Sequence, residues 1–140
     1  MLKIRSILMG FILIIPMITN AQEKKNLLKT SLIFPLAETF LVSYERMIGH
    51  ESSLEFEVVV GQGLSLRPSY RFYMSETKIA PSGGFISPYI HYLDDDLGAG
   101  LIVGYQRLFK SKISLEAFIG PGFYGEGVLP WGGINIGFAF

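Results

Sequence analysis

Charged side chains recur at even spacings in this chain, where they could support acid–base chemistry. Glu55 and Glu57 are two residues apart, and Arg67 and Arg71 are four apart. Residues at even spacings project from the same face of a β-strand. Such a face could line a polar conduit or bring two carboxylates to one substrate. Because these residues carry both signs of charge, a buried ion-pair network is the favoured interpretation.

Consecutive segments of the chain would bring these groups together. If the segments are neighbouring strands, the glutamates of two strands lie within reach of the arginines of a third. Carboxylates paired in this way make poor general acids, which argues for a structural network. The residues predicted to form it are Glu45, Glu55, Glu57, Arg67, Arg71 and Glu116.

A serine and a histidine form a second candidate site. Ser87 and His91 would share one strand face, and the acidic run 94–96 follows them. Serine, histidine and a carboxylate are the groups of many hydrolases. The acidic run could instead bind a divalent cation weakly, although a solvated turn is the favoured interpretation. We expect neither a metal ion nor a cofactor.

The elements that position these groups are predicted to be β-strands. The chain after residue 21 has no convincing helical period, and turn-forming clusters separate eight apolar segments at even spacing. This pattern predicts an all-β fold, an antiparallel up-and-down barrel. The predicted strands are 27–34, 40–47, 54–60, 64–74, 85–92, 99–109, 113–123 and 132–140.

Each predicted strand has one bulky apolar face. In the last strand Ile134, Ile136, Phe138 and Phe140 alternate with small or polar residues. Lipid would cover such a face, so the barrel is predicted to be transmembrane. Eight strands enclose a lumen just wide enough for side chains, so we expect a filled interior in which glycines accommodate bulky neighbours. Three prolines conflict with this pattern, because proline cannot donate a hydrogen bond to a neighbouring strand. We expect a bulge at each of them, or a position near a rim of the barrel: Pro68, Pro88 and Pro121.

The N-terminal residues predict export. Lys3 and Arg5 precede an apolar run over 7–18, and Ala21 offers a cleavage site. The run is too short to span a bilayer, so residues 1–21 are interpreted as a cleaved signal peptide and 22–140 as the barrel domain. Cysteine is absent, which excludes disulfides and a lipoprotein anchor. The balance of basic and acidic residues argues against nucleic-acid binding.

Short motifs suggest a family. Those at 26–30, 42–46, 67–73, 98–100 and 104–106 resemble small outer-membrane barrels classed under a domain of unknown function. The resemblance implies this fold and the outer membrane of a Gram-negative bacterium, and it carries no activity or cofactor. A final strand that ends in Phe140 also resembles the signal read by the barrel assembly machinery, so Phe140 is the predicted assembly signal.

The predicted function is therefore that of an integral outer-membrane protein with a structural or surface-interaction role, and not of an enzyme. Its expected partners are outer-membrane lipid and the assembly machinery, and it is expected to be a monomer. One alternative is a lipid-modifying hydrolase, although Ser87 and His91 would face inward, away from a lipid substrate. Another is a soluble periplasmic barrel that binds an apolar ligand. Residues 124–131 are predicted to form a loop that dips into the membrane interface or contacts a partner.

Overall fold

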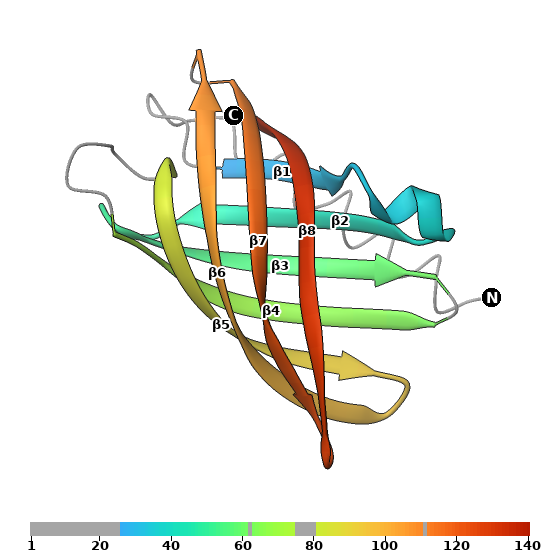
Figure 1. Cartoon of the computed structure of the whole chain (residues 1–140). Coiled ribbons are helices and arrows are strands. Elements are labelled where there is room, and N and C mark those ends of the chain that lie inside the picture. The colour runs from blue at the N-terminus through green and yellow to red at the C-terminus, as the bar shows by residue number, and fades with distance from the viewer. Residues whose placement is uncertain (1–25, 62, 75–80, 111) are drawn as a thin grey trace.

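Eight antiparallel strands close into one barrel in the computed structural model, which describes residues 26–61, 63–74, 81–110 and 112–140 (Figure 1). Each strand pairs with its neighbours in sequence, and β1 pairs with β8. The predicted all-β, eight-stranded antiparallel barrel is therefore confirmed. The proposed signal peptide lies outside the described residues. The strands are β1 (Asn26–Ser31), β2 (Phe40–Met47), β3 (Ser52–Val60), β4 (Leu64–Tyr73), β5 (Gly83–Leu93), β6 (Asp96–Phe109), β7 (Ile113–Tyr124) and β8 (Gly127–Ala139).

The first connection differs from the prediction. β1 ends at Ser31 rather than at residue 34, and a short 3-10 helix, η2 (Phe34–Ala37), follows it. The Ser31 hydroxyl accepts hydrogen bonds from the backbone N–H groups of Ile33 and Phe34 at 3.3 and 3.2 Å. Pro35 favours the first turn of a helix because it lacks an N–H. Together these contacts end the strand early.

Two hairpins at the end of the barrel opposite Asn26 and Phe140 are tighter than predicted. The turn between β5 and β6 consists of Asp94 and Asp95, whose φ angles of 45° and 71° suit a two-residue hairpin. The predicted loop 124–131 is wrong, because β7 continues to Tyr124 and β8 begins at Gly127. The pairing of β7 with β8 therefore extends through residues that the sequence pattern assigns to a loop. None of the described residues forms a helix long and apolar enough to cross a membrane.

The predicted proline bulges are absent from the described strands. Pro68 and Pro88 lie where the β4–β5 ladder is interrupted, and Pro121 lies at a similar gap between β6 and β7. The register is the same on both sides of each gap; for example, Leu66 pairs with Tyr92 before the β4–β5 gap and residue 72 pairs with 86 after it. Each proline removes a donor without adding a residue to its strand.

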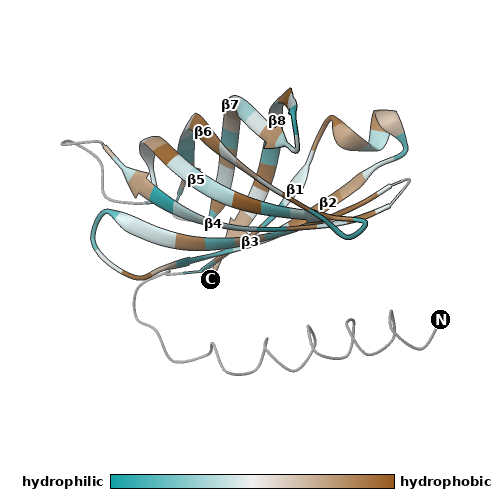
Figure 2. Cartoon of the chain, turned by 90° about the horizontal axis from the view of Figure 1, so that it is seen from below, coloured by the Kyte–Doolittle hydropathy of each residue, from teal (hydrophilic) through white to brown (hydrophobic). Residues whose placement is uncertain are grey.

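The strand alternation separates two chemically different faces. In β4, Arg67 and Arg71 are buried while Pro68 and Phe72 are exposed, as predicted, and Figure 2 shows hydrophilic and hydrophobic residues alternating along the strands. Inner glycines make room for bulky neighbours, mainly aromatic rings rather than the predicted arginines. A Cβ at Gly104 would lie 2.6 Å from the Phe85 ring.

Candidate functional site

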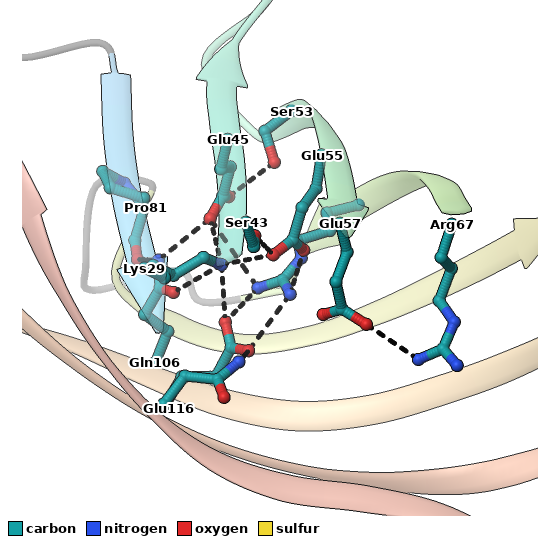
Figure 3. Close-up of polar contacts among 12 residues, drawn as sticks. Lys29, Ser43, Glu45, Ser53, Glu55, Glu57, Arg67, Pro81, Gln106 and Glu116 are labelled. Carbon is teal, nitrogen blue, oxygen red and sulfur yellow. Dashed lines mark hydrogen bonds and ion pairs between the residues drawn. The ribbon is translucent and has the colours of Figure 1, made fainter. Parts of the chain in front are cut away.

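A lysine surrounded by three carboxylates lies in the lumen (Figure 3). Lys29 Nζ is 2.8 Å from Glu45, 2.9 Å from Glu55 and 2.9 Å from Glu116. These side chains come from β1, β2, β3 and β7, so the closed barrel itself brings them together. The side chains of Lys29, Glu45 and Glu116 are fully excluded from solvent.

Arg71 supplies the second positive charge of this cluster. Its guanidinium pairs with Glu55 and, across the lumen, with Glu116, and it lies 3.7 Å from Glu45. It also stacks 4.1 Å above the centre of the Phe85 ring. The cluster, which we call the Lys29 network, thus contains three formal negative and two formal positive charges.

Neutral side chains donate further hydrogen bonds to the three carboxylates of this network. Glu45 accepts hydrogen bonds from Ser53 at 2.6 Å and from Tyr73. Ser43 donates to Glu55, and Asn135 Nδ2 donates to Glu116 Oε1 at 3.0 Å. Each of the three carboxylates of the Lys29 network therefore has both a cationic and a neutral partner. Buried charges stabilise a structure only when they are satisfied in this way.

A second, separate ion pair lies in the lumen. Arg67 binds Glu57 at 2.9 Å and stacks 3.8 Å from the centre of the Trp131 ring. His91 Nδ1 is 3.3 Å from Arg67. The six residues of the predicted network are all buried, and the structure divides them between this pair and the Lys29 network.

Lys29 and its neutral partners were absent from the predicted network. The alternation in β6 offers a signal for one of them, because Gln106 lies on the strand face opposite the bulky residues Val103 and Tyr105. Gln106 Nε2 donates to Tyr73 at 3.0 Å. Asn135 could be found in the same way, since it alternates with the bulky residues of β8. The sequence offers no such signal for Lys29, because β1 is short and the apolar residue Leu27 also lies on its inner face.

Three carboxylates this close together also resemble a metal site. Oxygens of Glu45, Glu55 and Glu116 lie within 4.8 Å of one another. However, Lys29 Nζ approaches all three within 2.9 Å, which is the position that an added cation would need. The chain therefore supplies its own cation, Lys29, and the cluster is an ion-pair network inside the barrel.

Ser87 and His91 do not form a nucleophile–base pair. Both are buried and face the lumen, but four residues of extended strand separate them by about 13 Å. Among the described residues, no carboxylate bonds to His91, whose Nδ1 lies near Ser65, Arg67 and Tyr124. Asp95 of the acidic turn instead accepts a hydrogen bond from the Tyr92 hydroxyl at 2.7 Å.

The fold and this site define a class of structure: a closed eight-stranded barrel whose lumen is filled by ion-paired side chains. No family model, curated protein or solved structure matches the chain.

Proposed function

We propose that this protein is an integral outer-membrane β-barrel with a structural role and no catalytic activity. The observation that carries the proposal is an inverted distribution of polarity. Among the described residues, 29 large hydrophobic side chains are exposed, whereas the buried set contains 17 polar or charged and only 9 hydrophobic side chains. Water would leave such a surface prone to aggregation. Lipid would cover it, and a closed barrel satisfies its own backbone groups.

The exposed charges also fit a membrane. In the described residues they lie in turns or within three residues of a strand end, so an apolar belt remains between them. Tyr92 and Tyr105 are exposed near strand ends, where aromatic side chains favour a membrane interface. The exposed charged side chains and histidine are Glu38, Arg46, His50, Glu51, Asp94, Asp95, Asp96, Arg107, Lys110, Lys112 and Glu126.

The short hairpins support a structural role over a surface-interaction role. At the end of the barrel opposite Asn26 and Phe140, the turns at 94–95 and 125–126 have two residues each, and of the connections between the described strands there only that from β1 to β2, 32–39, is longer than three residues. Transmembrane barrels commonly present longer loops at one end, and binding residues occur disproportionately on loops. A polar interior also fits poorly with the alternative of a soluble barrel that binds an apolar ligand, and the separation of Ser87 from His91 disfavours the hydrolase.

Location provides the direct test. Export by residues 1–21 and insertion of the apolar belt should place the protein in the outer-membrane fraction, with release by detergent and not by high salt or alkaline carbonate. Cell fractionation followed by immunoblotting measures this. Recovery in the soluble periplasm without detergent would refute the proposal.

A second test addresses assembly. Phe140 directly follows the closing strand, which ends at Ala139, and its backbone exchanges hydrogen bonds of 2.9 and 3.2 Å with Asn26. We propose that the assembly machinery reads its aromatic ring. Phe140→Ala should lower the amount of inserted protein in cells severalfold, yet leave refolding into lipid vesicles nearly unchanged because the backbone bonds remain. Phe138→Ala, on the same face, is the matched control and should insert more fully than Phe140→Ala. Equal insertion of the two variants would contradict the assignment.

A further inference from the structure

The exposed charges of the barrel segregate by sign between its two ends. At the end that holds Asn26 and Phe140, the exposed charged side chains of the described residues are basic, apart from Glu51. We call these the basic rim: Arg46, Arg107, Lys110 and Lys112. At the other end, all are acidic, and we call them the acidic rim: Glu38, Asp94, Asp95, Asp96 and Glu126.

Strand direction fixes this assignment. β2 ends at Met47, and Arg46 pairs with Asn26 at the start of β1. β6 runs toward the same end, where Lys110 and Lys112 lie in the turn into β7. The turns that carry Asp94, Asp95 and Glu126 connect the opposite ends of β5, β6, β7 and β8.

The positive charges of the basic rim are available to bind an anionic group. Within the described part of the chain, none of its four side chains forms an ion pair, in contrast to the lumen, where Lys29, Arg67 and Arg71 are all paired. Arg107 lies 5.1 Å from the ring centre of Phe109, which is itself exposed. Long basic side chains that border an apolar surface extend their charge toward the polar interface.

We propose that the basic rim binds the phosphate groups of anionic phospholipids at one face of the membrane. The inference rests on the proposed membrane location and adds the lipid class and the end of the barrel that recognises it. Each basic side chain near an anionic bilayer surface raises the association by about fivefold. The acidic rim repels the same headgroups. Attraction at one end and repulsion at the other therefore favour the same orientation of the barrel in the membrane.

Spin-labelled lipids provide the test. The purified barrel is reconstituted in phosphatidylcholine bilayers, and electron paramagnetic resonance measures the association of labelled phosphatidylglycerol relative to labelled phosphatidylcholine. We expect a preference for phosphatidylglycerol of about two- to threefold, averaged over all lipids around the barrel. The preference should weaken in 1 M salt, which shortens the screening length to about 3 Å.

Two matched variants locate the effect. The quadruple variant Arg46→Gln, Arg107→Gln, Lys110→Asn, Lys112→Gln should lose the preference; asparagine suits residue 110, whose φ is 50°. The control neutralises four of the five residues of the acidic rim through Glu38→Gln, Asp95→Asn, Asp96→Asn and Glu126→Gln, and it should retain the preference. Failure to insert into phosphatidylcholine would count against the membrane proposal itself. Insertion without a preference, or equal loss in both variants, would overturn only the lipid inference.

Discussion

Replacement of Lys29 by methionine is expected to destabilise the barrel by about 3–5 kcal/mol, because three buried carboxylates would then face a single guanidinium. Methionine keeps most of the length of the side chain, so the change removes charge and hydrogen bonds rather than volume. Urea-driven unfolding from phosphatidylcholine vesicles measures the loss. Lys112→Met, at an exposed lysine, is the matched control and should change the free energy of unfolding by less than about 0.5 kcal/mol.

A second substitution separates charge from packing in this prediction. Glu45→Gln removes one negative charge, while its carbonyl oxygen still accepts the hydrogen bonds from Ser53 and Tyr73. The double variant Lys29→Met, Glu45→Gln should therefore be more stable than Lys29→Met alone. Additive losses in the double-mutant cycle would show that Lys29 does not compensate Glu45. A small loss for Lys29→Met alone would show that water reaches the network.

The outer face of the barrel was predictable because its signal is local. Alternation within β3, β4 and β7 places Glu55, Arg71 and Glu116 on the face opposite the bulky residues, and no distant contact is needed to see it. β1 is too short for this argument. Its two consecutive leucines, Leu27 and Leu28, lie on opposite faces, so the apolar pattern does not establish the phase of Lys29.

Contacts across the lumen could not be derived from neighbouring strands. Arg71 and Glu116 are 45 residues apart, and they meet because the barrel is closed and narrow. When each strand is considered only with its neighbours in sequence, the predicted contacts are those between adjacent strands, such as the contact of Glu57 with Arg67. The sequence predicts a loop at Trp131, because glycine and proline surround it. The pairing of β8 with β7 continues past these residues and directs the indole ring over Arg67.

An arginine introduced in the middle of the apolar belt is expected to have the second large effect. Val103 lies near the centre of β6, is 48% exposed and is flanked by Ile86 and Ile119 on the neighbouring strands. In a bilayer, Val103→Arg should cost about 2–4 kcal/mol, because the guanidinium would lie near the midplane. The measurement is again urea unfolding from phosphatidylcholine vesicles.

The depth dependence of this cost distinguishes lipid from water around the barrel. Val128 is also exposed but is the second residue of β8, close to the acidic end. Val128→Arg should therefore cost only about 0–1 kcal/mol, since its charge can reach the interface. In water both arginines would be solvated, and both variants would be tolerated to the same degree. Equal, small effects at the two positions would thus favour a soluble barrel, whereas a large difference between them requires a nonpolar layer around the middle of the strands.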